Sequence, residues 1–319
     1  MCLKNIIQKT KSLFEKKENK RTMYVFSEIL KDHRALRFQE EGKKMGVEVK
    51  VLNMYKIFIK DGKMWDIDGG EIEIKKGDVA WILSNSVVSH YIADTLSNKL
   101  VWPDIQSVRF ADKFTTNTFF SDLGMPTPST VLLNSYEVEG IVEKVGGFPC
   151  IIKRNIGTVG KFVEIVNNKE EVREFVENNF DSIKKNLVPV GKAGFLLQEF
   201  IEESKGVDYR VLCLDGEVLG VIKREAQEGF KSNVSLGGKA TVVPTDEKLR
   251  EYALKIMKEG NLFYAGIDFM KQGDDYTALE VNTSAQFKGF EAATGLGGYI
   301  GFTTMGIFCF LLFKKVQKL

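Results

Sequence analysis

"LFYAGIDFMKQGDDYTALEVN", residues 262–282, has the pattern of two buried strands joined by a tight turn. The turn falls at Gly273 and Asp274, two residue types that tolerate the backbone of a short hairpin. Strand pairing then brings Asp268 of the first strand near the level of Glu280 of the second. We therefore expect polar side chains from both strands to converge on one spot.

The second strand carries Glu280 and Asn282 two positions apart, so both side chains point to the same face. Leu279 and Val281 are expected to face the other way. A carboxylate and an amide are costly to bury without partners. We expect Asp268, Glu280 and Asn282 to hold one or two divalent cations through their oxygen atoms.

The cysteine and histidine counts limit the kind of metal site. The 319 residues include four cysteines, far apart and without a Cys-x-x-Cys pair, and two histidines. These numbers exclude a disulfide framework, a zinc site and a histidine-based triad. Oxygen ligands favour Mg²⁺ or Mn²⁺, and the cysteine usage indicates a reducing, cytoplasmic compartment.

The net charge of +2 is unevenly distributed, because residues 1–22 carry an excess of five positive charges. The remainder is slightly acidic, so no overall basic field indicates nucleic acid. The basic tail is either a loosely ordered extension or an amphipathic helix that contacts a membrane or partner. A closed homo-oligomer is the default expectation for a soluble enzyme.

From Met23 strands and helices alternate in the α/β manner. The stretches "MYVFSE", "VEVKVLN" and "DVAWILS" have strand patterns, and "RALRFQEEGKKMG" has a helical pattern closed by Gly46. We expect a small open-sheet domain over residues 23–107. Asp112 is the predicted N-cap of a following helix, which ends near Gly124 and Pro126.

The stretch "GGFPCIIKRNIGTVGKFVEIVNN" predicts two strands joined by a glycine-bearing loop. Lys153 ends the first strand beside Gly157, Thr158 and Gly160, an arrangement that can cradle phosphate. The spacing does not match a P-loop, since Asn155 stands where the first glycine is required. An ordinary glycine hairpin with a solvated lysine is the alternative.

Residues 195–226 predict one buried strand, "FLLQEFIEE", and then a hairpin turning at Asp215 and Gly216. The hairpin carries Asp208, Arg210 and Arg224. Each of these charges could form half of a surface ion pair, which is the alternative to a role in a site.

Together these motifs resemble the ATP-grasp superfamily, and specifically RimK-type alpha-L-glutamate ligases. The resemblance runs from about Met23 to about Gly301 and rests on the order of six motifs: Lys113 after "AD", Lys153 with "GTVG", "QEFIEESKGVDYRV", "IKREAQEGFKSNVSLGGKA", "AGIDF" and "LEVNTS". It implies a mixed α/β ATP-grasp fold with an N-terminal pre-ATP-grasp domain. The implied organisation is a basic extension over 1–22, the open-sheet domain over 23–107, a central lid subdomain over 108–190 and a C-terminal subdomain with the metal site over 191–319.

The resemblance also implies roles for single residues. ATP phosphates would contact Lys113 and Lys153, with the loop of Gly157, Thr158 and Gly160 as a lid. The adenine hinge would be Glu199 and Phe200, the ribose acid Asp208, and a further nucleotide-binding triplet Lys231, Ser232 and Asn233. The ligands of Mg²⁺ or Mn²⁺, two ions in this family, would be Asp268, Glu280 and Asn282. Positive charge near the transferred phosphate or the substrate carboxylate would come from Arg210 and Arg224.

The implied reaction forms an amide through an acylphosphate, which an amine attacks. It needs positioning and charge neutralisation rather than a protein nucleophile. The implied substrates are an amino acid, glutamate by family default, and a peptide, protein tail or small cofactor with a carboxylate. A helix packed on the domain is implied for the apolar segment 295–319, with a peripheral membrane contact as the alternative.

Two departures affect the substrate more than the nucleotide. The family usually has Ser-Pro-Gly after the metal asparagine, whereas this chain has Ser284, Ala285 and Gln286, and Lys161 replaces a common lid glycine. Carrier modification, peptide macrocyclisation and a nucleotide-binding protein without turnover are therefore the alternatives. The sequence names neither the acceptor nor the amine, nor the number of residues added.

Overall fold

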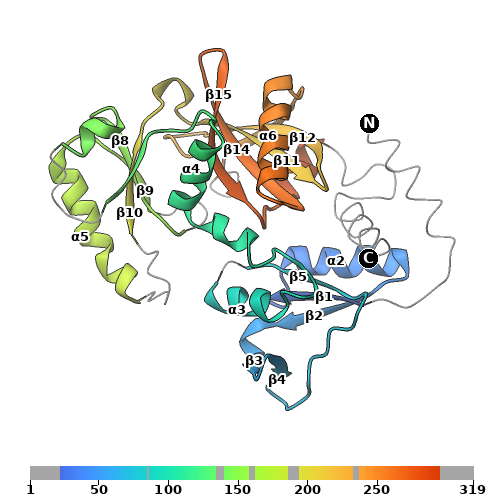
Figure 1. Cartoon of the computed structure of the whole chain (residues 1–319). Helices are drawn as coiled ribbons and strands as arrows, with labels where there is room; N and C mark the ends of the chain where they lie inside the picture. The colour runs from blue at the N-terminus through green and yellow to red at the C-terminus, as the bar shows by residue number, and fades with distance from the viewer. Residues whose placement is uncertain are drawn as a thin grey trace.

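The computed structural model describes residues 22–84, 86–133, 140–157, 162–185, 194–232 and 237–294. These residues form three units, each built on its own β-sheet (Figure 1). The basic tail up to residue 21 and the apolar segment from residue 295 lie outside this part of the chain. Within the described ranges, no helix is both long enough and apolar enough to cross a membrane.

The N-terminal unit is a four-stranded parallel sheet with the order β2-β1-β5-β6. Helix α2 begins after its N-cap Asp32 and ends at Gly46, whose left-handed backbone (φ 69°) confirms the predicted stop. A small antiparallel hairpin, β3 with β4, was not predicted. The elements are β1 (Thr22–Ser27), α2 (His33–Met45), β2 (Glu48–Asn53), β3 (Ile57–Lys60), β4 (Lys63–Asp66), β5 (Val79–Ile82), α3 (Val87–Thr95) and β6 (Leu100–Trp102).

The second unit is an antiparallel sheet with the order β7-β10-β8-β9. The two strands expected around the glycine loop are β8 and β9. We expected residues 195–199 in the C-terminal subdomain, but β10 pairs with β7 and β8, so the sheet extends past the expected boundary at residue 190. The elements are β7 (Thr130–Leu133), β8 (Cys150–Arg154), β9 (Val163–Val166), α5 (Lys169–Lys185) and β10 (Phe195–Glu199).

The third unit is a five-stranded antiparallel sheet with the order β13-β12-β11-β14-β15. Both predicted hairpin turns lie where the sequence placed them, between β11 and β12 and between β14 and β15. The strands are β11 (Val207–Leu214), β12 (Glu217–Glu225), β13 (Lys239–Val243), β14 (Tyr264–Gln272) and β15 (Asp275–Asn282). The helices of this unit are α6 (Glu247–Glu259) and α7 (Lys288–Thr294).

Helix α4 (Lys113–Asp122) begins at the predicted N-cap, where the carboxylate of Asp112 accepts a hydrogen bond from Thr115 N at 2.6 Å. Sequence reasoning placed this helix in the lid subdomain. Its buried Phe120 instead belongs to the core of the third unit, and Ala278 N of β15 donates to Pro126 O at 2.8 Å just after the helix. Helix α4 therefore supports the strand that carries Glu280.

One hydrophobic core joins the first and third units. The rings of Trp81 and Tyr264 lie 5.9 Å apart, and those of Trp102 and Phe263 lie 6.0 Å apart. The second unit has a separate core made only of residues between 133 and 197. The molecule therefore consists of a joined pair of units and one unit that packs by itself, as the separate green lobe of Figure 1 indicates.

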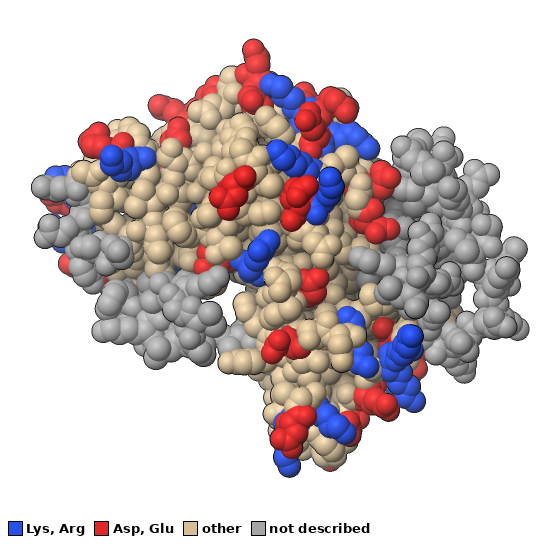
Figure 2. All heavy atoms as spheres, viewed as in Figure 1, with Lys and Arg blue, Asp and Glu red and all other residues tan. Residues whose placement is uncertain are grey.

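Charged side chains on the face shown in Figure 2 are of mixed sign, with Lys and Arg lying among Asp and Glu. This face therefore presents no patch of a single charge.

Candidate functional site

Strand pairing in the third sheet brings the predicted metal ligands together. Asp268 of β14 lies directly opposite Glu280 of β15, and Gly266 lies opposite Asn282. Arg210 of β11 pairs with Asp268 on the other side. Each of these pairs spans neighbouring strands, so the side chains share one face of the sheet.

A register shift in this hairpin alters one sequence expectation. Asp268 pairs with Glu280, whereas the next residue, Phe269, pairs with Ala278, so Leu279 is the extra residue of a β-bulge. We expected Leu279 to face away from Glu280, but both line the same cavity. The bulge breaks the strict alternation on which that expectation rested.

The acids and arginines of this sheet form a buried network. The guanidinium of Arg210 donates to both carboxylate oxygens of Asp268 at 2.6 Å each. Arg224 donates to both oxygens of Asp208 at 2.5 and 2.7 Å, and its Nη2 also donates to Asp268 Oδ2 at 2.9 Å. Ser232 donates to the same Asp208 carboxylate. The alternative for these charges was a surface ion pair, whereas the pairs they form are largely buried and their members line the cavity.

Burial by itself would favour the neutral form of Asp268, which is 3% exposed. The charges and hydrogen bonds of Arg210 and Arg224 outweigh burial and hold the pKa of Asp268 below its usual value. The carboxylate is therefore ionised, as a cation ligand must be.

The oxygen atoms of Asp268, Glu280 and Asn282 suit a divalent cation that is also bound to phosphate oxygens. Among the described residues, no three His, Cys, Asp or Glu side chains form a preformed metal cage. In the amide orientation that satisfies both neighbours, Asn282 donates to Glu280 Oε1 at 3.0 Å and accepts from Arg210 Nη2 at 3.2 Å. Asp268 is already held by two arginines, which leaves Glu280 and Asn282 as the more available ligands. Mg²⁺ commonly takes one or two carboxylates and completes its shell with water and phosphate oxygens.

Two lysines line the same cavity: Lys153 comes from the second unit, which we call the lid, and Lys113 comes from the first turn of α4. Lys153 of β8 is 7% exposed, and its Nζ donates to Gln198 Oε1 at 2.8 Å. Burial, together with the nearby charge of Lys113, lowers the pKa of Lys153 to about 7. Lys113 donates from its Nζ to Gly157 O at 2.8 Å. The remaining lid residues of the prediction, Thr158 and Gly160, lie outside the described residues.

Asn155 fixes the start of helix α4 relative to the glycine loop. Its side chain donates to Asp112 Oδ2 at 2.8 Å and accepts from Phe114 N at 2.9 Å. The backbone N–H of Lys113 donates to Asn155 O at 3.2 Å. This residue occupies the position that a P-loop gives to glycine, and its side chain instead holds the two phosphate-binding candidates Lys113 and Lys153 close together.

These groups line one cavity of about 820 Å³ between the lid and the third sheet. The predicted hinge residues Glu199 and Phe200 lie in its wall, as do the apolar side chains of Ile151, Met270 and Leu279. A cavity lined by both apolar side chains and cations can accommodate the base and the phosphates of a nucleotide. The other predicted residues in its wall are Lys113, Lys153, Gly157, Asp208, Arg210, Arg224, Lys231, Ser232, Asp268, Glu280 and Asn282. Asn233 lies outside the described residues.

Sequence reasoning missed several residues of the cavity wall. Gln198, which accepts a hydrogen bond from Lys153, lies in the predicted strand "FLLQEFIEE" and was given no role. Arg34 and Ser84 come from the N-terminal unit, to which the prediction assigned no site residue. The sequence could have indicated both residues, because they lie at or after the ends of strands predicted from the sequence, and open α/β sheets bind ligands at the carboxyl ends of their parallel strands.

The comparisons with known proteins agree with this geometry. A family model described as the RimK-like ATP-grasp domain matches residues 110–298. A probable alpha-L-glutamate ligase of Legionella pneumophila is 33% identical over 190 residues, which cover 59% of this chain and 60% of that protein. The match thus spans about three fifths of the length of that relative.

Solved structures show the same fold at low sequence identity. The ATP-grasp ligase PsnB complexed with a minimal precursor has a TM-score of 0.66 at 17% identity, covering 93% of this chain and 100% of that one. The D-alanine–D-alanine ligase of Bacillus anthracis complexed with ATP has a TM-score of 0.65 at 18% identity, covering 94% and 99%. Both likenesses include the N-terminal unit, which the family model leaves out.

Proposed function

The chain belongs to the RimK-like ATP-grasp family, and from this premise we propose that it is an ATP-dependent ligase that joins a carboxylate to an amine. One observation carries the proposal: Lys113, Lys153, Glu280 and Asn282 line a single cavity. Cations and oxygen ligands in one cavity suit the triphosphate of Mg²⁺-ATP. ATP-grasp ligases use ATP, as the complex of the Bacillus anthracis ligase illustrates. We propose two metal ions, and this number comes from the resemblance to the family, not from the geometry of the cavity.

Within this proposal each wall of the cavity has a task. Lys113 and Lys153 bind phosphate oxygens, and the backbone and side chains of Glu199 and Phe200 face the adenine. Asp208 is buried against Arg224 and Ser232. Both oxygens of Asp208 already accept hydrogen bonds from Arg224. For Asp208 to contact the ribose, the nucleotide must therefore approach the carboxylate from the side of Ser232. A bound divalent cation would neutralise phosphate charge between Glu280 and Asn282.

The reaction begins when an oxygen of the substrate carboxylate attacks the γ-phosphorus, which breaks the bond to ADP and gives an acylphosphate. The amine, which as an ammonium first loses a proton to water, then attacks the acyl carbon, and the amide forms as phosphate leaves and the nitrogen loses a second proton to water. Arg210 faces the cavity and can bind the substrate carboxylate or the transferred phosphate, while Arg224 holds Asp268 and Asp208 in place. The protein supplies position and charge, and the lid excludes the water that would hydrolyse the intermediate.

Glutamate is the proposed amine because the curated relatives are named as glutamate ligases. Gln286 stands where the family usually has glycine, and its exposed side chain lines the cavity. Because Gln286 replaces this glycine, we propose that the chain prefers a different substrate from its relatives while catalysing the same type of reaction. The cysteines Cys150 and Cys213 are buried and free, which supports the proposal of a reducing compartment.

The test is ADP release from Mg²⁺-ATP in the presence of single amino acids and short acidic peptides. The native chain should release ADP only when an acid and an amine are both present, and Glu280→Ala should abolish release. Glu259→Ala, which removes the last residue of α6, an acid that does not line the cavity, is the matched control. Thermal stabilisation by ATP without ADP release under any pair would instead indicate a nucleotide-binding protein.

A further inference from the structure

The cavity continues beyond the phosphate end to the N-terminal unit. Its wall there is formed by Arg34, Leu83 and Ser84, and by Ser284 and Gln286 from the loop after β15. In the parallel sheet the chain passes from β1 to β2 on one side and to β5 on the other. The carboxyl ends of β1 and β5 therefore form a topological switch point, where sheets of this kind bind ligands.

The loop after β15 is held firmly against the N-terminal unit. Two donors come from the N-terminal unit: Trp102 Nε1 donates to Thr283 O at 2.9 Å, and Arg34 Nη1 donates to Ser284 O at 3.3 Å. The next carbonyl, Ala285 O, accepts from Tyr264 Oη of β14 in the third unit at 2.7 Å. This end of the cavity thus has a fixed position relative to Asn282, which lies directly before the loop.

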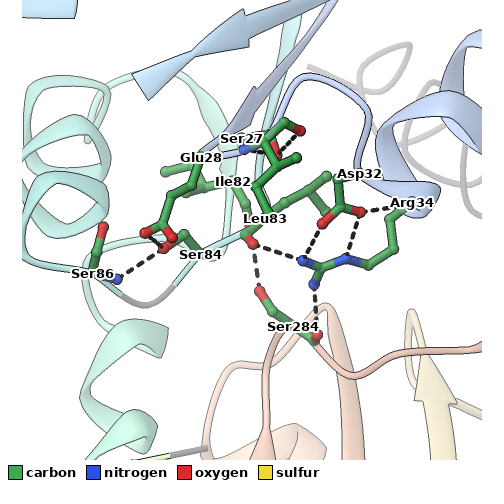
Figure 3. Close-up of polar contacts among 10 residues, drawn as sticks. Ser27, Glu28, Asp32, Arg34, Ile82, Leu83, Ser84, Ser86 and Ser284 are labelled. Atoms are coloured by element: carbon green, nitrogen blue, oxygen red, sulfur yellow. Dashed lines mark hydrogen bonds and ion pairs between the residues drawn. The ribbon is translucent and has the colours of Figure 1, made fainter. Parts of the chain in front are cut away.

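Arg34 uses its charge and most of its donors on the protein itself. Its guanidinium pairs with both oxygens of Asp32 at 3.1 and 3.0 Å, and Nη2 also donates to Leu83 O at 2.9 Å (Figure 3). Four of the five N–H groups of the side chain are thereby engaged. The charges of Asp32 and Arg34 neutralise each other. The hydrogen bonds of Arg34 to Leu83 O and Ser284 O connect the N-terminal unit to the third unit.

Glu28 is different from its neighbour Asp32. It directly follows β1, and its Oε1 accepts a hydrogen bond from Ser84 Oγ at 2.5 Å, which places the carboxylate one hydrogen bond behind the cavity wall (Figure 3). Ser86 N donates to the same Ser84 oxygen at 3.0 Å, and this orients the hydroxyl group toward Glu28. Within the described ranges, no Lys or Arg lies within ion-pair distance of Glu28. The buried Ser86 Oγ beside it has no hydrogen-bond partner in that part of the chain.

The charges at the two ends of the cavity are therefore opposite. Lys113 and Lys153, whose amino groups donate to neutral oxygens, make the phosphate end suitable for the triphosphate, whereas Arg210 is paired with Asp268. An aliphatic amine is a cation in neutral water, and a half-buried carboxylate without a protein cation is the group that would bind it. The two substrates are thus sorted by charge.

We propose that Glu28 and Ser84 form the subsite that binds the ammonium group of the amine substrate, an amino acid or a peptide with a free amino group. This inference rests on the proposed ligase function. The amine would then lie at the switch point of the N-terminal sheet. The loop with Ser284 and Gln286 lies between this position and the phosphate end of the cavity.

The test compares two nucleophiles in Glu28→Gln, which keeps the size of the side chain and an oxygen that can accept from Ser84. Hydroxylamine is uncharged near neutral pH and traps the acylphosphate as a hydroxamate without needing an ammonium subsite. An amino-acid amine needs the subsite. We expect Glu28→Gln to lower kcat/KM for the amine by about tenfold to a hundredfold relative to hydroxamate formation, the range for losing a charged hydrogen bond. Glu48→Gln, at the amino end of β2, makes the same charge change and should leave this ratio at the native value.

A binding measurement serves as the second test. With Mg²⁺ and a non-hydrolysable ATP analogue present, each of the common amino acids is tested for thermal stabilisation of the native chain and of both variants. At least one should stabilise the native chain and Glu48→Gln, but not Glu28→Gln. The subsite is refuted if Glu28→Gln responds like the native chain, or if no amino acid stabilises the native chain. Absence of acid-dependent hydroxamate from the native chain would refute the ligase function instead.

Discussion

Lys153 shows how its surroundings set the chemistry of a residue. The side chain is buried at the end of β8, and its hydrogen bond is to the neutral amide of Gln198 rather than to a carboxylate. A cation in this place is costly without a negative partner, and a phosphate group would supply one. Lys153 therefore lowers the free energy of unfolding of the protein without a bound anion, and the same side chain is positioned to bind one.

This cost predicts a particular pH dependence. The pKa of Lys153 in the folded protein is about 7, below its ordinary value of 10.5. Between these values the unfolded chain binds more protons, so the free energy of unfolding should rise with pH, by at most about 1.4 kcal/mol per unit. Lys153→Met should remove this rise.

Urea unfolding between about pH 7 and pH 9 measures the difference. Lys50→Met, at an exposed position of β2, is the control and should keep the native pH dependence. Equal slopes in the native chain and in Lys153→Met would mean that this lysine does not titrate in the expected range.

At the scale of elements, the contact between β14 and the loop after β15 depends on a missing side chain. A Cβ atom built on Gly266 would lie 2.6 Å from the Cβ of Ala285 and 3.3 Å from Cδ of Arg210. The glycine thus allows the loop to lie directly on the strand that carries Asp268. Its role is close approach, since its backbone is that of an ordinary strand.

Gly266→Ala should therefore displace the loop and destabilise the protein by about 1–3 kcal/mol, the usual cost of overpacking. The double variant Gly266→Ala/Ala285→Gly should recover most of this loss, because it moves the methyl group from one side of the contact to the other. Chemical denaturation gives the free energies. Gly70→Ala, where a Cβ meets nothing within 4 Å, is the control. A double variant as unstable as the single one would contradict the steric explanation.

At the scale of the whole molecule, the lid and the rest of the protein have separate cores. The cavity lies between them, with Lys153 on the lid and Glu280 on the third sheet. A ligand that contacts both walls joins two bodies that otherwise share few buried apolar contacts. Nucleotide binding should thus change the stability of the lid more than that of the joined pair.

Hydrogen exchange measured by mass spectrometry can test this independence. Peptides from β8 and β10 should exchange through a lower-energy opening than peptides from β11 and β14. Mg²⁺-ADP should slow exchange in the lid strands more than in the third sheet. A single common rate in all four strands, with and without nucleotide, would show that the protein opens as one unit.

Local chemistry made some of these features predictable. The turn at Gly273, the end of α2 at Gly46 and the N-cap at Asp112 each depend on backbone preferences of one or two residues, and all three are confirmed. The family, too, could be recognised from motifs in order, and the match over residues 110–298 confirms it. The roles of single site residues stay predictions.

What the sequence by itself determined is which groups are present and their spacing along the chain: the oxygen ligands on one hairpin, the lysine beside a glycine loop, and the absence of histidine and cysteine clusters. Only the tertiary structure decided which groups meet. It placed β10 in the lid sheet, turned Leu279 into the cavity, paired Asp268 with two arginines and left Glu28 without a cation in the described part of the chain. The reason is physical: periodicity and turn preferences act over a few residues, whereas pairing and burial depend on residues far apart in the chain.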